Sequence, residues 1–196
     1  MFTTEKGMDF FMAMIVRSVL AATVSLAAAV GGLATAHAEG RTPISSVASG
    51  AVVRLEVSHS GKCLDLNSVN PGNTKNGARA LQWECDGSST QQWRAIPTDN
   101  SSFELRSVPS TKCLEVENSG TQAGATVQQW DCNGGKNMRW SMILVDQQKK
   151  LFQLRPTHTK ERCLDVYDAG TANGATVQQW YCNQTAAQLW RVLPVS

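Results

Sequence analysis

The feature that most constrains the fold of this chain is a threefold recurrence of cysteine and tryptophan. The first cysteine of each pair recurs every 50 residues, at positions 63, 113 and 163. A tryptophan lies two residues before the second cysteine of each pair, and a further tryptophan follows ten residues later. All six cysteines and all six tryptophans belong to this pattern. Such repetition predicts three similar units that must pack together to bury a shared core.

The pattern within each repeat is that of short β-strands. Segments 51–57, 102–108 and 150–156 mix β-branched and other apolar residues, and turn residues follow each of them. The first cysteine then begins the phrase CLDL, CLEV or CLDV, in which period-two alternation separates the acid from the apolar residues. We therefore expect an all-β domain of three pseudo-repeats around a threefold axis, with about twelve short strands.

The start of the chain is typical of a secretory signal peptide. Lys6 and Arg17 precede an apolar, alanine-rich run that ends on the small–x–small triplet at 36–38. We predict a bacterial type of signal peptide over 1–38, cleaved after about Ala38, and a secreted protein. A transmembrane anchor is the alternative, but the run is only weakly apolar and no charged stop follows it directly. A short linker (39–49) and one domain (50–196) follow, with lobes of about 50–97, 98–147 and 148–196.

Charge and cysteine usage narrow the class of protein further. The net charge of +2 at neutral pH is too small and too dispersed to favour nucleic acid or a membrane surface as a partner. No second apolar span follows the leader. A secreted chain with an even number of cysteines, two in each repeat, favours disulfides over metal ligation, because the clustered spacing of a zinc site is missing. We expect the pairs Cys63–Cys85, Cys113–Cys132 and Cys163–Cys182, each of which contributes about 3 kcal/mol of stability.

The threefold Cys-Leu-Asp … Gln-x-Trp pattern resembles the ricin B-type lectins, which include carbohydrate-binding modules of bacterial xylanases. The resemblance extends from about Gly50 to Pro194. It implies a β-trefoil fold with a shallow sugar pocket in each lobe. An Asp after the first cysteine would accept hydrogen bonds from sugar hydroxyls, and an aromatic residue before the second cysteine would stack on the sugar. A Gln two positions before that aromatic residue, and an Asn–Gln pair before the last Trp, would complete the pocket.

The residue types suit sugar recognition independently of the family. A carboxylate accepts hydroxyl protons in charge-assisted hydrogen bonds, and a carboxamide both donates and accepts. An indole face covers the C–H patch of a sugar ring and removes apolar area from water. An acid, an amide and an aromatic ring that converge on one groove therefore indicate carbohydrate binding, for which no proton transfer, cofactor or metal is needed.

Carried over residue by residue, the resemblance implies three unequal sites. The third lobe matches best, although Ala187 replaces the Asn, and its predicted sugar-binding residues are Asp165, Gln178, Trp180 and Gln188. The first lobe has Leu81 and Thr90 where amides are expected, and keeps Asp65, Trp83 and Gln91. The second lobe has Met138 in place of the last Gln, and its candidates are Glu115, Gln128, Trp130 and Asn137. Glu115 is one methylene longer than Asp, so its oxygens are expected out of register. We rank the third lobe first and the second last.

Some of these side chains have structural alternatives. Trp93, Trp140 and Trp190 lie in apolar runs and are predicted to be core residues. The three tryptophans before the second cysteines could instead pack against the disulfides. Gln91 and Gln188 could bind buried backbone groups, and Asp65 and Asp165 could cap turns.

Three classes of function remain open at this stage. The favoured class is a secreted lectin that binds galactose- or xylose-type sugars or polysaccharides through up to three lobes. A β-trefoil module that binds proteins, such as an inhibitor or a toxin component, is the alternative. An enzyme is not expected, because the repeats occupy the chain and no catalytic arrangement lies outside them. Neither the particular sugar nor the oligomeric state follows from the sequence.

Overall fold

The structure is a computed structural model that describes residues 49–66, 74–99 and 101–195. The predicted signal peptide and nearly all of the predicted linker lie outside these residues. The described residues belong to one compact unit, Arg41–Ser196. None of the helices among them is long and apolar enough to span a membrane.

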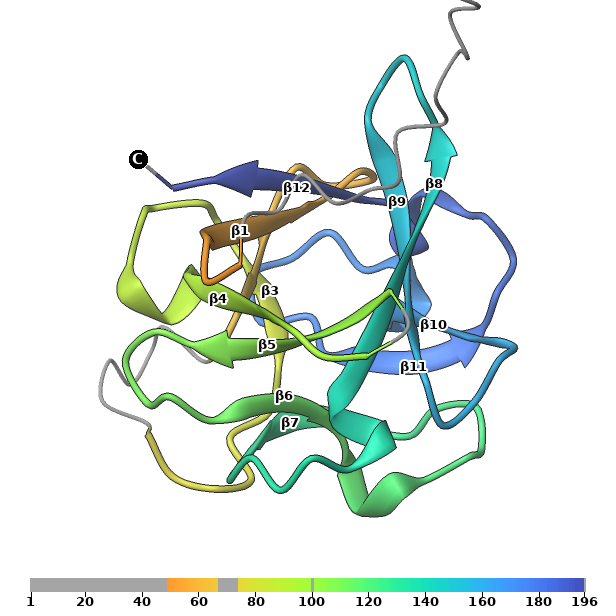
Figure 1. Ribbon diagram of the computed structural model, residues 1–196. Helices are drawn as coiled ribbons and strands as arrows, with labels where there is room; N and C mark the ends of the chain where they lie inside the picture. Colours follow the sequence, from red (N-terminus) through yellow and green to blue (C-terminus); the bar gives the residue numbers. More distant parts are fainter. Residues whose placement is uncertain (1–48, 67–73, 100, 196) are drawn as a thin grey trace, which may run out of the picture. The chain divides into compact units, whose positions relative to one another are not determined.

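Each repeat folds into four short strands, as the sequence predicts (Figure 1). The first lobe contains β1 (Val52–Val57), β2 (Cys63–Asp65), β3 (Leu81–Trp83) and β4 (Trp93–Pro97). The second contains β5 (Ser102–Ser107), β6 (Cys113–Val116), β7 (Val127–Trp130) and β8 (Arg139–Asp146). The third contains β9 (Leu151–Pro156), β10 (Arg162–Val166), β11 (Val177–Tyr181) and β12 (Trp190–Pro194). Short 3-10 helices occur between strands, namely η1 (Ser89–Gln91), η2 (Glu117–Ser119), η3 (Lys136–Met138), η4 (Tyr167–Ala169) and η5 (Ala186–Gln188).

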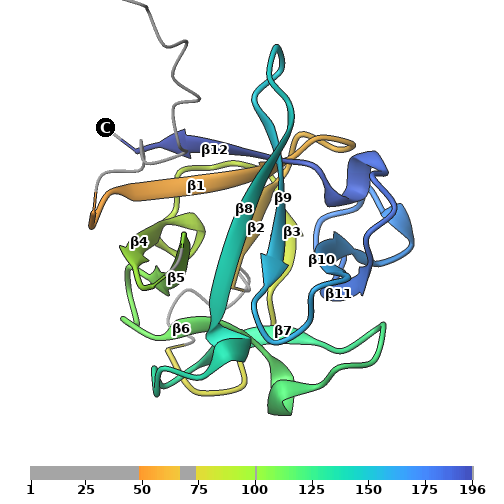
Figure 2. The same cartoon turned by 45° about the vertical axis from the view of Figure 1, so that its right-hand side comes forward.

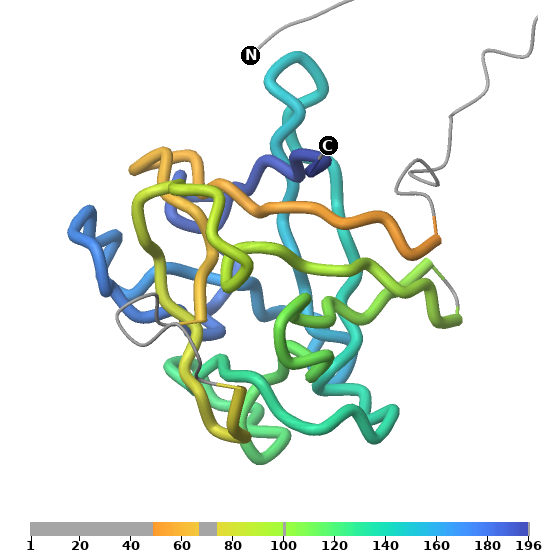
Figure 3. The backbone as a smooth tube through the Cα atoms, turned by 90° about the vertical axis from the view of Figure 1, so that its left-hand side faces the viewer, coloured from red at the N-terminus to blue at the C-terminus, as the bar shows by residue number. Residues whose placement is uncertain are grey.

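Two strands of each lobe close a barrel, and the other two form a separate hairpin. Antiparallel pairing runs from β1 to β4, β5, β8, β9 and β12, and then returns to β1. The hairpins are β2–β3, β6–β7 and β10–β11 (Figure 2). The first strand of the domain, orange in Figure 3, therefore lies beside the last one, in dark blue. A six-stranded barrel with three hairpins is the β-trefoil, so the predicted fold class is confirmed.

The core contains one tryptophan from each lobe, as predicted. Trp93, Trp140 and Trp190 are completely buried. Each indole Nε1 donates to the carbonyl oxygen of the leucine that follows the first cysteine of its lobe, at 3.0–3.2 Å. Buried indole groups need such a partner, so these bonds anchor the hairpin strands β2, β6 and β10 to the core.

The three predicted disulfides are present, one in each lobe: Cys63–Cys85, Cys113–Cys132 and Cys163–Cys182. Each joins the beginning of a hairpin's first strand to a cysteine one or two residues beyond its second strand. The disulfide therefore closes the open end of each hairpin, where a two-stranded ribbon is otherwise only marginally stable.

A completely buried glutamine precedes the hairpin tryptophan in each lobe, at positions 82, 129 and 179. Gln82 Nε2 donates to the carbonyl oxygens of Gly170 and Ala172 in the third lobe, at 2.7 and 2.9 Å. Its Oε1 accepts from Ser60 Oγ at 2.8 Å. Because buried carbonyl groups need hydrogen-bond partners, this side chain fastens the turn of one lobe to the hairpin of another.

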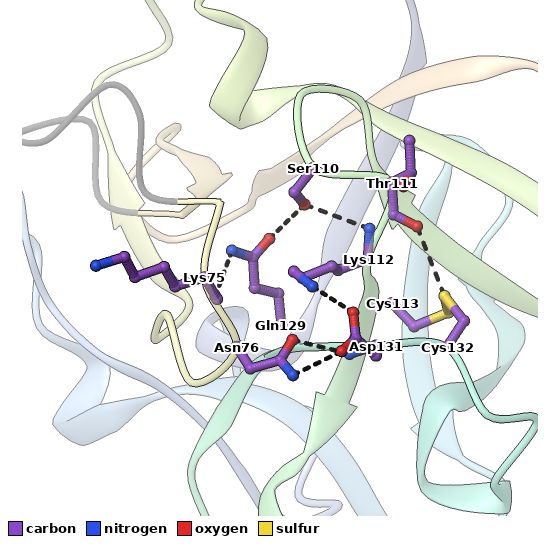
Figure 4. Close-up of polar contacts among 9 residues, drawn as sticks. All are labelled: Lys75, Asn76, Ser110, Thr111, Lys112, Cys113, Gln129, Asp131 and Cys132. Carbon is purple, nitrogen blue, oxygen red and sulfur yellow. Dashed lines mark hydrogen bonds and ion pairs between the residues drawn. A yellow bond between two sulfur atoms is a disulfide. The ribbon is translucent and has the colours of Figure 1, made fainter.

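The same arrangement recurs at the other two junctions between lobes. Gln179 Nε2 donates to the carbonyl oxygens of Gly120 and Gln122 in the second lobe. Gln129 Nε2 donates to the carbonyl oxygen of Lys75 in the first lobe, and its Oε1 accepts from Ser110 Oγ (Figure 4). The three hairpins are thus linked in a ring, the third to the second, the second to the first and the first to the third.

Candidate carbohydrate-binding sites

In the third lobe a buried carboxylate is held by two amides. Asp165 on β10 lies opposite Gln178 on β11 and is only 5% exposed. Gln178 Nε2 donates to Asp165 Oδ1 at 2.8 Å, and Gln188 Nε2 donates to Oδ2 at 3.0 Å. A carboxylate has about four acceptor positions, so two protein donors leave capacity for hydroxyl donors of a ligand.

Gln188 is used entirely within the protein. Besides Asp165, its Nε2 donates to the Tyr181 carbonyl oxygen at 2.8 Å. Its Oε1 accepts from the backbone N–H of Asn183 at 2.9 Å. The side chain is completely buried. Gln188 therefore combines the two alternatives raised by the sequence, because it binds backbone groups and also orients the acid of the site.

The aromatic residue of the third lobe lies at the surface. Trp180 is 38% exposed, as expected for a ring that offers a face to a ligand. The turn of the second lobe flanks the site, because a Cβ on Gly124 would lie 3.7 Å from the Trp180 ring and 3.8 Å from Gln178 Oε1. The backbone N–H of Gly124 also donates to the Gln179 carbonyl oxygen at 2.8 Å. The wall of this site therefore comes from a different lobe, which the sequence did not reveal.

The first lobe keeps the acid and one of its two amides. Gln91 Nε2 donates to Asp65 Oδ2 at 2.9 Å and to the Glu84 carbonyl oxygen at 2.7 Å. Across the hairpin from Asp65 lies Leu81, which has no polar side-chain atom. Trp83 is half-buried. The first lobe therefore offers an acid and a ring, but not the cross-strand amide of the third lobe.

The second lobe holds its longer acid with a different pair of amides. Glu115 lies opposite Gln128 in the hairpin, in the register of Asp165 and Gln178. Gln128 Nε2 donates to Glu115 Oε1, and Asn137 Nδ2 donates to Oε2, both at 2.9 Å. The longer side chain therefore keeps its cross-strand partner. Trp130 is exposed.

The second amide donor shifts by one residue between lobes. In the first and third lobes it is the last residue of a 3-10 helix, Gln91 or Gln188. In the second lobe the last residue is Met138, which is completely buried, and the residue before it, Asn137, donates instead. The pair of Glu and Asn thus replaces the pair of Asp and Gln, and the extra methylene of the acid offsets the shorter amide.

Burial changes the acidity of two of these acids. Removal from water raises the pKa of Asp165, and the bonds from Gln178 and Gln188 and the nearby His59 oppose this effect in part. Burial likewise raises the pKa of Glu115, against the bonds from Gln128 and Asn137. Both groups are held by donors that favour the charged form.

The loop after each of these two acids has a shared, unusual backbone. Asn118 and Ser119 in the second lobe, and Asp168 and Ala169 in the third, have φ between 47° and 53°. Two successive non-glycine residues in the left-handed region are uncommon and cost free energy, so the surrounding structure must enforce them. The second and third lobes therefore share this loop conformation.

In the described part of the chain, side chains of the types that bind metal ions come together at one place. Glu104 lies near Cys113 and Cys132, but these two sulfur atoms are joined in a disulfide and are not available as thiolates. None of the candidate sugar-binding residues belongs to this group.

Comparison with known proteins places this architecture in a family. The family model described as "Ricin-type beta-trefoil lectin domain-like" matches residues 44–130, 97–180 and 161–196. A search of curated proteins gives no significant match. Among solved structures, the designed threefold-symmetric protein ThreeFoil is 33% identical, with a TM-score of 0.68, over 74% of this chain and 99% of that one.

Two natural proteins share the fold. An exo-β-1,3-galactanase from Clostridium thermocellum is 27% identical with a TM-score of 0.68, and the match covers 74% of this chain and 30% of the enzyme. A ricin B-like lectin from Macrolepiota procera, solved with lactose, is 19% identical with a TM-score of 0.64, over 74% of this chain and 96% of the lectin. The family supports carbohydrate binding in general. By its repeated sequence, its fold and the match over residues 44–196, this chain belongs to the ricin-type β-trefoil lectin-like family.

Proposed function

We propose that this protein is a secreted, non-enzymatic lectin that binds galactose- or xylose-type sugars in glycans or polysaccharides. The third lobe is its main site, and the first and second lobes are weaker ones. The observation that carries the proposal is the buried Asp165 carboxylate, which two amides hold beside the exposed ring of Trp180. Three disulfides among the described residues are compatible with an extracellular location.

The geometry supports a role for each residue of this site. Asp165 accepts hydrogen bonds from two neighbouring hydroxyls, because its oxygens are already oriented by Gln178 and Gln188. The amide oxygen of Gln178 is available to a hydroxyl donor, while Trp180 covers the C–H face of the sugar. Gln188 acts through Asp165. No group in this constellation needs to transfer a proton, which is why binding rather than catalysis is proposed.

The identity of the sugar is part of the proposal. The galactanase acts on a β-1,3-linked galactan, and the Macrolepiota lectin was solved with lactose, which contains galactose. Both neighbours favour a galactose-type ligand, and the sequence resemblance to xylanase modules adds xylose. A shallow site with few contacts implies an affinity per lobe in about the millimolar range. Several lobes on one polysaccharide would raise the apparent affinity by effective concentration.

A glycan array that includes galactose- and xylose-terminated ligands, galactan and xylan tests the proposal. The wild-type protein should bind one of these classes, and Asp165→Asn should lose most of the signal. Asp146→Asn is the matched control, because it makes the same charge change on the β8–β9 hairpin and should bind as wild type. Binding that survives the combined loss of Asp65 and Asp165 would contradict the site assignment. If no carbohydrate binds, the protein-binding alternative replaces the lectin proposal.

A further inference from the structure

The third lobe differs from the other two at the residue after its hairpin tryptophan. The first and second lobes carry the acids Glu84 and Asp131 at this position, and the third carries Tyr181. In the second lobe other side chains bind the acid. Lys112 forms an ion pair with Asp131, and Asn76 Nδ2 donates to the Asp131 carboxylate at 2.8 Å (Figure 4). Nothing in that arrangement offers an apolar surface to a ligand.

In the third lobe the ion pair is replaced by a cation and an aromatic ring. Arg162 lies directly across the hairpin from Tyr181, and its guanidinium carbon is 3.9 Å from the centre of the tyrosine ring. This contact fixes the ring, because a guanidinium over an aromatic face is attracted by its quadrupole. Tyr181 is nevertheless 55% exposed. A large aromatic ring is thus held rigidly at the surface.

Tyr181 also adjoins the candidate sugar site. Its ring centre is 6.0 Å from that of Trp180, and the two rings are nearly perpendicular, at 82°. Both rings are exposed, so a ligand that covers the Trp180 ring has a second aromatic ring beside it. Glu84 and Asp131 give the other lobes no such second ring.

The neighbouring lobe leaves this surface open. In the first lobe the backbone N–H of Glu84 donates to Oδ1 of Asn173, from the turn of the third lobe, at 3.0 Å. In the second lobe the backbone N–H of Asp131 donates to Oδ1 of Asn76, from the turn of the first lobe, at 3.1 Å. The corresponding turn residue at the third lobe is Ala123, which precedes Gly124 beside Trp180. An alanine side chain is too short to reach over the end of the hairpin, so the cover found on the other lobes is reduced to a methyl group.

We propose that Tyr181, braced by Arg162, forms a second sugar subsite, so that the third lobe binds two adjacent units of a glycan chain. Trp180 and Asp165 hold the first unit, and Tyr181 contacts the next one. This inference rests on the lectin function proposed above and specifies its ligand as an oligosaccharide or polysaccharide. An aromatic ring suits this role because the C–H groups of a sugar pack on it without requiring one particular linkage.

The test measures sugar affinity by calorimetry in a Trp83→Ala, Trp130→Ala background, in which the first and second lobes lack their aromatic ring and only the third lobe keeps its own. The probes are galactose and β-1,3-galactobiose, with xylose and xylobiose as the second pair. The disaccharide of the bound type should bind about tenfold more tightly than its monosaccharide, which corresponds to one added ring contact. Tyr181→Asp, which supplies the residue of the second lobe and an ion-pair partner for Arg162, should remove this advantage and leave monosaccharide binding unchanged. Tyr167→Asp, a change on another exposed tyrosine of the same lobe, is the matched control.

The outcomes separate the two proposals. Equal affinities of the wild-type lobe for monosaccharide and disaccharide, or an unchanged preference in Tyr181→Asp, would overturn the second subsite and leave the lectin function intact. A loss of monosaccharide binding in Tyr181→Asp, with the fold intact by circular dichroism, would place Tyr181 in the first subsite and also overturn the inference. If neither the background protein nor the wild type binds any of the four sugars, the lectin function itself fails and the inference fails with it.

Discussion

Asp165 and Gln188 lie 23 residues apart in the chain and are joined by a buried hydrogen bond of 3.0 Å from Nε2 to Oδ2. The first lobe contains the same bond between Asp65 and Gln91, at 2.9 Å. In both lobes the glutamine also binds two backbone groups of the segment after the hairpin tryptophan. One side chain therefore fixes both the acid of the candidate site and the chain that carries the ring, so this arrangement is organised without a ligand.

The first prediction concerns Gln188. Replacement by Met, the residue of the second lobe, would leave the Tyr181 carbonyl and the Asn183 N–H without this partner. We expect the free energy of unfolding to fall by about 2 kcal/mol, since buried polar groups lose their hydrogen bonds. Sugar affinity of the third lobe should fall as well, because Asp165 loses a donor that orients it. Urea unfolding and calorimetry measure the two effects.

Ala186→Ser is the control for this change, because it alters an exposed residue of the same 3-10 helix. It should leave the stability within about 0.5 kcal/mol of wild type. A Gln188→Met protein that is as stable as this control would show that the bonds of Gln188 are not important for the fold.

The second prediction tests the matched pairs of acid and amide. Glu115→Asp alone should shorten the acid away from Asn137, and Met138→Gln alone should place an amide in a buried position built for a thioether. Each single change should therefore destabilise the protein by about 1–3 kcal/mol. Together they recreate the Asp–Gln pair of the third lobe. The double variant should therefore be more stable, by about 1–2 kcal/mol, than the sum of the two single changes in the free energy of unfolding predicts. A double-mutant cycle by urea unfolding measures this coupling, and additive effects would refute it.

The third prediction concerns the glutamines that link the lobes. Gln82→Leu would remove the donor for the carbonyl groups of Gly170 and Ala172 and the acceptor for Ser60 Oγ. Because all three groups belong to a buried or half-buried junction, we expect a loss of about 2–4 kcal/mol in the free energy of unfolding.

Gln92→Leu is the comparison for this third change. Gln92 donates one exposed hydrogen bond, to the Gly87 carbonyl oxygen at 3.1 Å, so its replacement should cost less than about 1 kcal/mol. Similar losses for the two variants in thermal or urea unfolding would mean that the junction between lobes does not depend on Gln82.

The sequence was sufficient to predict the features that repeat. The cysteine and tryptophan spacing gave three four-stranded lobes, the disulfide pairs and the three core tryptophans, because strong local patterns recur at a fixed period. The family resemblance also named the acids and amides that face each other across the hairpins of the second and third lobes. These features depend on residues that are close in the sequence.

The sequence did not predict features that depend on contacts between lobes. Gln82, Gln129 and Gln179 recur before each hairpin tryptophan, which was a signal, but their partners are turn carbonyls of other lobes and carry no sequence mark. For the same reason the role of Gly124 beside Trp180 could not be seen. The compensation between Glu115 and Asn137 was also not predicted, because it depends on a contact between two residues that are 22 positions apart in the chain.

The last prediction is the pH dependence of the third lobe. Burial raises the pKa of Asp165 above that of an unfolded aspartate, so the native state takes up this proton more readily than the unfolded state. The stability contributed by this group therefore falls as the pH rises from the unfolded value through the raised folded value, and acid does not unfold the protein through Asp165. Sugar binding has the opposite dependence, since the ionised carboxylate is the acceptor. We expect affinity to decline on acidification with a midpoint above the usual aspartate pKa, while the fold persists. Calorimetry with the bound sugar between pH 3 and pH 7, beside a carboxyl NMR titration of Asp165, tests this, and a midpoint at or below the ordinary value would contradict it.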